Sequence, residues 1–322
     1  MARSPFSFFF HFLFLTANTV AFAFPHSTSL QAREVTNTSK AGLAWPNGNS
    51  VDMTQFALSD KISWYYTWSA WPVKSQTELE FVPMLWGERS IEDFNSTIFQ
   101  TLSQAQPPVT AILGMNEPDQ GGQSSMTPQE AAQMWQTFLQ PLRAYAVRLG
   151  SPATSSAPAG KQWLQDFFTA CGANCTVDFV ATHWYGTDAQ AFIDYVIDYN
   201  TTFGKPIWIT EWACQNFVNF SDQCSDEDVR VFMNTTQAFL DNAEFVERYS
   251  WFGAMKTMAD VNADNALMDT NGRINALGHQ YINDNTTLVS VARGGASSLS
   301  VISSRASVAA ALWISFALIF SF

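Results

Sequence analysis

The fold is decided by a short apolar stretch, Phe-Val-Ala-Thr-His-Trp at residues 179–184, and by its repetition along the chain. Seven other short runs resemble it, and longer segments with helical patterns separate them. Near-continuous apolar runs of this length are typical of strands that are buried on both faces of a parallel sheet. The eight runs cover residues 41–45, 62–68, 81–86, 111–116, 147–152, 179–184, 207–212 and 249–254.

Helix start signals lie between these runs. Thr127-Pro128-Gln129-Glu130 combines an N-cap threonine, a proline in the first turn and a glutamate that completes a capping box. Ser225 precedes three acidic residues, and Ser90 is expected to cap a further helix that runs to about residue 103. Eight strands that alternate with helices over about 250 residues predict an α/β fold, a single-domain (β/α)8 TIM barrel. An open doubly wound sheet is the alternative, but residues 42–47 do not form the glycine-rich phosphate loop that usually accompanies it.

Composition narrows the class of partner. The chain of 322 residues has 12 tryptophans, only 14% charged residues and a formal net charge of -12. This charge argues against nucleic acid, because phosphate binding needs a cationic surface. Indole rings stack on the apolar C–H faces of sugars, so the composition favours a neutral carbohydrate partner. The alternative for many of the tryptophans is that they fill a large core.

Both ends of the chain carry apolar segments that are typical of targeting signals. Residues 1–23 combine an early arginine, an apolar stretch and a small-residue pattern, and predict a secretory signal peptide. Small residues at 294–298, a polar spacer and a terminal apolar tail predict a GPI-attachment signal, with residues 299–322 removed. A membrane-spanning helix is the alternative at each end, although an apolar run of about 15 residues at the C-terminus is short for a bilayer.

These signals predict a secreted protein at the cell surface or cell wall, in contact with the plasma membrane only through its GPI anchor. One folded domain is expected at residues 40–283, between flexible stalks at 24–39 and 284–298. An oxidising compartment favours disulfides among the four cysteines, with the local pairs Cys171–Cys175 and Cys214–Cys224 preferred over the other pairings and over a zinc site. Seven glycosylation sequons agree with secretion: Asn37, Asn95, Asn174, Asn200, Asn219, Asn234 and Asn285.

Two glutamates stand where the chemistry of a barrel collects, at the C-terminal ends of strands. Glu117 follows the fourth run and Glu211 ends the seventh. These strands lie on nearly opposite sides of an eight-stranded ring, so the two carboxylates are expected to meet across its mouth. Paired carboxylates at such a position predict glycoside hydrolysis, in which one acts as acid and the other as nucleophile or base. For either glutamate considered alone, the alternative interpretation is a structural ion pair or a helix cap.

Other side chains at the strand ends predict a substrate-binding surface. Asn116 is a candidate partner for a sugar hydroxyl, and His183 and Tyr185 are candidates to orient the nucleophile; a buried core histidine is the alternative for His183. No metal or organic cofactor is expected, because the carboxylate pair is sufficient. The aromatic residues expected to face the substrate are Trp45, Tyr66, Trp86, Trp184, Trp212 and Trp251.

These motifs carry a family resemblance. Asn116-Glu117-Pro118 and Thr210-Glu211-Trp212 resemble the catalytic motifs of clan A of the glycoside hydrolases. Together with Gly42–Trp45, Met84–Gly87 and His183–Tyr185, they are similar to glycoside hydrolase family 128. The resemblance implies a (β/α)8 barrel and retaining cleavage of β-1,3-glucan, with Glu117 as acid/base and Glu211 as nucleophile. It also implies a place in the fungal cell wall.

The leading hypothesis is therefore a monomeric endo-β-1,3-glucanase whose partner is β-glucan. The first alternative is a non-catalytic surface protein that binds β-glucan and tolerates loss of either glutamate. The second is a hydrolase of another β-glycan, such as mannan or β-1,4-glucan.

Overall fold

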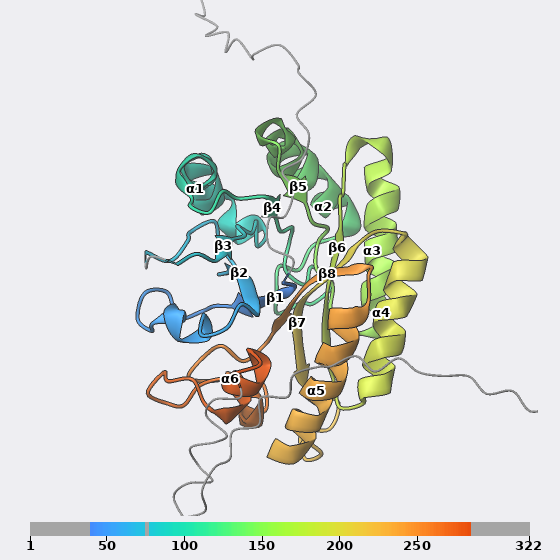
Figure 1. Cartoon of the computed structure of the whole chain (residues 1–322). Coiled ribbons are helices and arrows are strands. Elements are labelled where there is room, and N and C mark those ends of the chain that lie inside the picture. Colours follow the sequence, from blue (N-terminus) through green and yellow to red (C-terminus); the bar gives the residue numbers. More distant parts are fainter. Residues whose placement is uncertain (1–38, 75–76, 285–322) are drawn as a thin grey trace, which may run out of the picture.

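The computed structural model describes residues 39–74 and 77–284, in which eight strands gather at the centre and helices surround them (Figure 1). The predicted signal peptide, the GPI signal, most of both stalks and the sequons at Asn37 and Asn285 lie outside the described residues. The strands are β1 (Ala41–Ala44), β2 (Ile62–Tyr66), β3 (Glu80–Phe81), β4 (Ala111–Ile112), β5 (Arg148–Leu149), β6 (Val180–Gly186), β7 (Ile207–Cys214) and β8 (Val246–Trp251).

All strand pairings are parallel and together they close a ring. Six strands form a sheet in the order β3-β2-β1-β8-β7-β6, and β4 pairs with β5. Two isolated parallel bridges, Met84 with Leu113 and Gly150 with Phe179, join the pair to the sheet on both sides. The predicted (β/α)8 barrel is confirmed.

The helices also follow the predicted alternation. They are α1 (Ile91–Gln104), α2 (Pro128–Met134), α3 (Pro158–Cys171), α4 (Ala189–Phe203), α5 (Asp226–Asn242) and α6 (Ala276–Tyr281). Thr127 forms the predicted capping box at the start of α2. Ser225 stands at the predicted start of α5, where it also forms a capping box with Asp228 that was not predicted from the sequence. Among the described residues, β1 is followed only by the short 3-10 helix Met53–Phe56, and no helix separates β2 from β3.

Some predicted strand boundaries are wrong. The eighth strand begins at Val246 rather than at residue 249. The sequence hides this start because Glu247 and Arg248 are charged, yet Arg248 is buried and its guanidinium pairs with Glu80. The third, fourth and fifth strands are only two residues long, and isolated bridges continue their ladders toward the mouth.

The barrel interior is filled by aromatic side chains from the strands. The rings of Phe179 and Trp208 stack with centroids 3.9 Å apart, and Trp64 lies 5.4 Å from Trp208. The Arg248 guanidinium lies 4.6 Å from the Trp208 ring centroid, and Glu80 compensates its charge. A buried cation needs such a partner because desolvation is costly. This aromatic layer lies beneath the polar residues at the mouth of the barrel.

Both ends of the described domain lie at the face where the strands begin. Lys40 precedes β1, and its ammonium donates to the carbonyl oxygen of Ala243, just before β8. Ile282 follows α6 and accepts a hydrogen bond from the hydroxyl of Ser59, just before β2. The first and last described residues therefore lie on the opposite side of the barrel from the C-terminal strand ends.

Two local disulfides form as predicted. Cys171–Cys175 closes the end of α3, and Cys214–Cys224 closes the loop between β7 and α5. Four of the described sequon asparagines, Asn95, Asn174, Asn219 and Asn234, are exposed, and Asn200 is half-buried. Their glycosylation stays a prediction.

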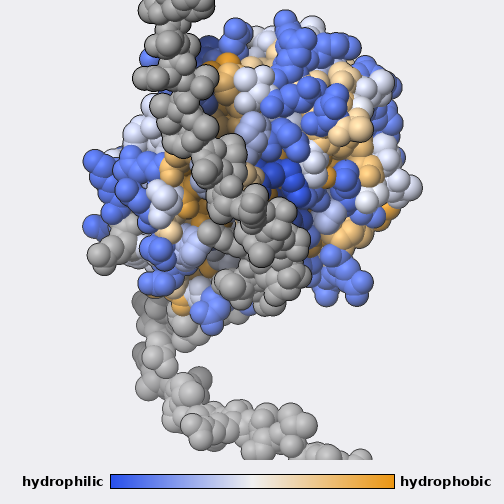
Figure 2. All heavy atoms as spheres, turned by 90° about the horizontal axis from the view of Figure 1, so that it is seen from above, coloured by the Kyte–Doolittle hydropathy of each residue, from blue (hydrophilic) through white to orange (hydrophobic). Residues whose placement is uncertain are grey.

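The described surface mixes hydrophilic residues with smaller hydrophobic patches when the molecule is seen from above (Figure 2). Among residues 39–74 and 77–284, no helix is both long enough and apolar enough to span a bilayer.

Candidate active site

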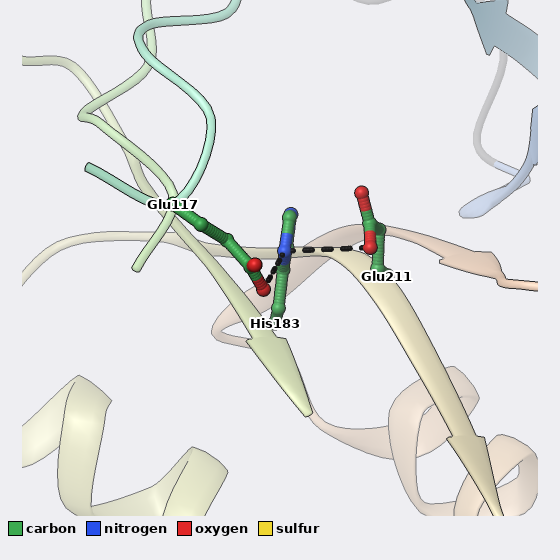
Figure 3. Close-up of side chains that lie close together, drawn as sticks. All are labelled: Glu117, His183 and Glu211. Carbon is green, nitrogen blue, oxygen red and sulfur yellow. Dashed lines mark hydrogen bonds and ion pairs between the residues drawn. The ribbon is translucent and has the colours of Figure 1, made fainter. Parts of the chain in front are cut away.

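Glu117 lies in a turn with unusual backbone geometry. Its φ is 41°, in the left-handed region that a residue with a Cβ adopts rarely and at a cost of the order of 1–2 kcal/mol. Backbone hydrogen bonds hold the turn: the Glu117 amide donates to Ala153 and the Asn116 amide to Trp86. Such strain is concentrated at functional sites, where the surrounding structure fixes it. Here it aims the Glu117 carboxylate at His183 (Figure 3).

Glu211 projects from the middle of β7 and is held by two donors. The indole nitrogen of Trp68 donates to Oε1 at 2.8 Å, and the hydroxyl of Tyr185 donates to Oε2 at 2.5 Å. The hydroxyl of Tyr66 donates to the carbonyl oxygen of Thr210, the preceding residue. Glu211 is only 5% exposed, so these bonds fix the direction of a nearly buried carboxylate.

His183 connects the two carboxylates. Its Nδ1 lies 2.9 Å from Oε1 of Glu117 and 3.5 Å from Oε2 of Glu211 (Figure 3). Ligand atoms of the three side chains all lie within 4.8 Å of one another. The structure thus brings together two glutamates that are 94 positions apart in the chain, as their places at the fourth and seventh strands predict.

Glu211 and His183 have pKa values that their neighbours shift. Burial and the neighbouring Glu117 raise the pKa of Glu211, while His183, Tyr185 and Trp68 oppose that rise. Burial alone would lower the pKa of His183, but the two adjacent carboxylates raise it overall. The pKa of Glu211 and the pKa of His183 are therefore coupled, because each group is a cause of the shift of the other.

An open cleft of about 1020 Å³ lies above the cluster. Its lining includes five predicted site residues: Trp86, Asn116, Glu117, Tyr185 and Glu211. Asn116 donates through Nδ2 to Gln123, but its buried Oδ1 has no hydrogen-bond partner. A buried acceptor without a partner is costly, so this oxygen is available to a hydroxyl group of a ligand in the cleft.

Three predicted stacking residues are core residues instead. Trp45, Trp212 and Trp251 have no exposed surface and do not line the cleft. Their indole nitrogens donate within the protein, to Gly48, Thr236 and Asn265 respectively. The prediction that they contact substrate is wrong, because successive strand residues face opposite sides of the sheet and these three face the helices.

Three more predicted residues serve the site indirectly or not at all. Tyr66 is fully buried, beneath Glu211, and supports the backbone of β7. His183 is also fully buried, so it acts on the carboxylates rather than on a ligand. Trp184 is half-buried on the outside of β6 and packs on Tyr195, with ring centroids 4.9 Å apart, away from the cleft. The prediction that these three residues contact substrate directly is therefore wrong.

Several cleft residues are absent from the predicted set of substrate-binding residues. Trp68 and Phe252 stand near the ends of the second and eighth runs, where the strand-end argument places aromatic side chains at the mouth, and both line the cleft. Gln120, Gln123 and Phe217 lie in loops, where the sequence gives no signal of which side chains turn toward the cleft. Among the described residues, the one group of three possible metal ligands is Glu117, His183 and Glu211 itself.

Comparison with known proteins agrees with this geometry. The family model described as "Glycosyl hydrolase catalytic core" matches residues 42–281. Alkali-sensitive linkage protein 1 of Schizosaccharomyces pombe is 34% identical over 250 residues, which are 76% of this chain and 44% of that protein. The chain thus spans less than half the length of that curated relative.

Solved structures of glycoside hydrolase family 128 share the fold. A subgroup III curdlan-specific exo-β-1,3-glucanase from Blastomyces gilchristii is 31% identical, with a TM-score of 0.63, over 76% of this chain and 98% of that one. A subgroup V exo-β-1,3-glucanase from Cryptococcus neoformans is 30% identical, with a TM-score of 0.66 and coverage of 76% and 98%. A subgroup I endo-β-1,3-glucanase from Amycolatopsis mediterranei, in complex with laminaritriose, is 28% identical, with a TM-score of 0.61 and coverage of 77% and 100%.

Three findings lead to one assignment: a (β/α)8 barrel with two converging glutamates at its mouth, a family model that covers most of the chain, and solved structures that are 30% and 31% identical. The chain belongs to the glycosyl hydrolase catalytic core family and, within it, to glycoside hydrolase family 128.

Proposed function

We propose that the protein is a retaining glycoside hydrolase that cleaves β-1,3-glucan. The observation that carries the proposal is that one carboxylate oxygen of Glu117 and one of Glu211 lie within 4.8 Å of each other. Retaining enzymes hold their carboxyl groups about 5–5.5 Å apart, whereas inverting enzymes leave about 6.5–9.5 Å for a water molecule. The β-1,3-glucanases that share the fold support the choice of substrate.

The surroundings of the two glutamates support their roles. Glu211 receives hydrogen bonds from Trp68 and Tyr185 and lies beside His183, and all three stabilise its ionised form. A nucleophile must be ionised to attack. Glu117 contacts His183 alone among these donors, and its carboxyl group faces the same cleft. Glu211 is therefore assigned as nucleophile and Glu117 as general acid/base.

The proposed reaction has two steps. In the first, an oxygen of Glu211 attacks the anomeric carbon while Glu117 gives its proton to the glycosidic oxygen, so the C–O bond to the leaving sugar breaks and a glycosyl ester forms. In the second, Glu117 takes a proton from a water molecule whose oxygen attacks the same carbon and displaces Glu211. Two inversions restore the original anomeric configuration.

Laminarin incubated with the pure protein tests this proposal. Glu117→Gln and Glu211→Gln should each lower kcat by several orders of magnitude, because each removes a group that acts in the transition state. Proton NMR of the first product should show the β-anomer before mutarotation. An α-anomer as first product would contradict retention, and binding of laminarin without any turnover would favour the binding-protein alternative.

Internal cleavage remains part of the proposal, and product length tests it. Endo-action on laminarin should release short oligosaccharides of several lengths from the earliest time points. Release of a single small product from the start would instead assign exo-action, which two of the compared neighbours show.

We also propose that the protein acts as a monomer outside the cell, held by a GPI anchor. Two disulfides and four exposed sequon asparagines among the described residues support a secreted glycoprotein. Treatment of intact cells with a phosphatidylinositol-specific phospholipase should release the protein into the medium. Retention on the cells, with no shift in detergent partitioning, would count against the anchor.

A further inference from the structure

The loop between β7 and α5 carries exposed apolar side chains at the edge of the cleft. Phe217 is 44% exposed, Val218 99% and Phe220 65%. Phe217 and Val218 also line the cleft. Neighbouring large apolar side chains that remain exposed are a mark of a binding surface. These three residues are called the rim platform below.

The rim platform stands on a fixed loop. The Cys214–Cys224 disulfide closes the loop at its base. Inside it, the Asn216 amide donates to Gln223, and the Gln223 side-chain amide donates back to the Asn216 carbonyl oxygen at 2.7 Å. Asn262, from the segment after β8, donates to the carbonyl oxygen of Cys224. A loop organised in this way loses little conformational freedom when a ligand binds.

The rim platform is continuous with the catalytic cluster. The Phe217 ring packs edge-on against Tyr185, with centroids 5.2 Å apart, and Tyr185 donates to Glu211. The Phe220 ring follows on the outer side, with its centroid 6.1 Å from that of Phe217. The contacts thus run without a break from the catalytic pair to the outer end of the platform.

The lining of the cleft indicates the chemistry of its ligand. Among the described residues, the charged side chains that line it are the two catalytic glutamates and Asp260, and no cation is present. Apolar rings in a cleft without cations suit the C–H faces of a neutral sugar better than an acidic polymer. We propose that the rim platform is a stacking subsite for glucose units beyond the cleaved bond, and that it makes the enzyme prefer polymeric glucan to short oligosaccharides. This inference rests on the proposed function.

The test compares a polymer with a trisaccharide. Phe217→Ala/Phe220→Ala should lower kcat/KM on laminarin by at least about 10-fold, because two ring contacts are lost, and should change kcat/KM on laminaritriose much less. Phe220→Ala alone, which leaves the Phe217–Tyr185 contact intact, should lower kcat/KM on laminarin by about 3-fold. Phe99→Ala is the matched control, since Phe99 is 51% exposed on α1 and does not line the cleft. Equal losses on both substrates, or no loss on laminarin, would overturn the inference.

A binding experiment separates this inference from the proposed function. In a native gel that contains laminarin, Glu211→Gln should be retarded, and Glu211→Gln/Phe220→Ala should be retarded less. Platform-dependent retardation without hydrolysis by the wild type would contradict the proposed function but support the subsite. Hydrolysis with equal retardation of both variants would overturn the subsite alone.

Two further controls exclude other roles of the loop. Asn219 lies between Val218 and Phe220 and begins a sequon, so Asn219→Gln should leave the preference for laminarin unchanged. A preference that disappears with Asn219→Gln would assign the effect to a glycan. Concentration-dependent dimers that Phe220→Ala dissociates, together with an unchanged preference for laminarin, would assign the surface to self-association.

Discussion

At the scale of single residues, the site depends on how a buried carboxylate is kept ionised. Glu211 is nearly buried beside another glutamate, and both facts raise its pKa. The hydrogen bonds from Tyr185 and Trp68 act in the opposite direction. His183 and the two aromatic donors therefore together set the lowest pH at which Glu211 is ionised.

Tyr185→Phe should move the acid limb of the pH profile of kcat/KM to higher pH. The change removes a donor that lowers the pKa of Glu211, so this pKa rises and a more alkaline solution is needed to ionise Glu211, the proposed nucleophile. At its optimum, kcat/KM should fall about 10- to 100-fold, as expected for the loss of a hydrogen bond to a charged group. Tyr195→Phe, at a buried hydroxyl that contacts Thr182 instead, should leave the acid limb in place. An unchanged limb in Tyr185→Phe would contradict this account.

Substitution of His183 leads to a related prediction. His183→Gln removes a cationic partner that lowers the pKa of Glu211, so the acid limb should again move to higher pH. The fall in kcat/KM should exceed that in Tyr185→Phe, because His183 contacts both carboxylates. Rates measured across pH with laminarin test the order of the two variants, and a smaller effect at His183 would contradict it.

The sequence could predict which glutamates meet but not which aromatic rings face them. Glu117 and Glu211 follow apolar strands, and parallel strands deliver their C-terminal ends to one mouth. Trp212, by contrast, is adjacent to Glu211 and turns to the other side of β7, because strand side chains alternate. The pairing of β6 and β7 has a bulge between Thr182 and His183, which shifts this alternation locally. No residue type in the sequence indicates that bulge.

At the scale of elements, the helices begin where capping residues place them. Thr127 accepts from the Glu130 amide, and the Glu130 side chain accepts from the Thr127 amide at 2.8 Å. These bonds satisfy amides that a helix start otherwise leaves without partners. The capping signals were predictable because both partners lie within four residues. The positions of strands β3 to β5 were also predictable from their apolar runs, but their short lengths were not, because these depend on neighbours far away in the chain.

Thr127→Ala should destabilise the protein by about 1 kcal/mol, the usual loss for an N-cap hydroxyl. The measurement is urea denaturation followed by tryptophan fluorescence. Thr137→Ala is the matched control, since Thr137 is an exposed threonine that bonds only to the Gln133 carbonyl oxygen four residues earlier. A loss in Thr127→Ala no larger than in this control would contradict the role of the cap.

At the scale of the whole molecule, one ion pair ties together distant parts of the barrel. Arg248 on β8 and Glu80 on β3 are 168 positions apart, and both are buried. Glu80 also accepts hydrogen bonds from the amide and hydroxyl of Thr110, just before β4. The pair therefore helps to close the ring between strands that the sheet order does not make neighbours.

Arg248→Met should destabilise the barrel by about 3–5 kcal/mol, because it leaves the Glu80 carboxylate buried without its partner. Arg248→Met/Glu80→Gln should recover part of this loss, since the stranded charge is then removed. Arg230→Ala, which breaks an exposed pair with Asp226, should cost at most about 0.5 kcal/mol. Equal losses in the single and double variants, measured by chemical denaturation, would show that the stranded charge is not the cause.

The position of Lys40 and Asp284 on the strand-start face has a consequence for how the enzyme meets its polymer. Both ends of the described domain lie on the side of the barrel away from Glu117 and Glu211. A molecule tethered through either flank would therefore expose its cleft on the side that faces away from the tether. Long, insoluble glucan chains could then reach the cleft without first passing the surface to which the protein is tethered.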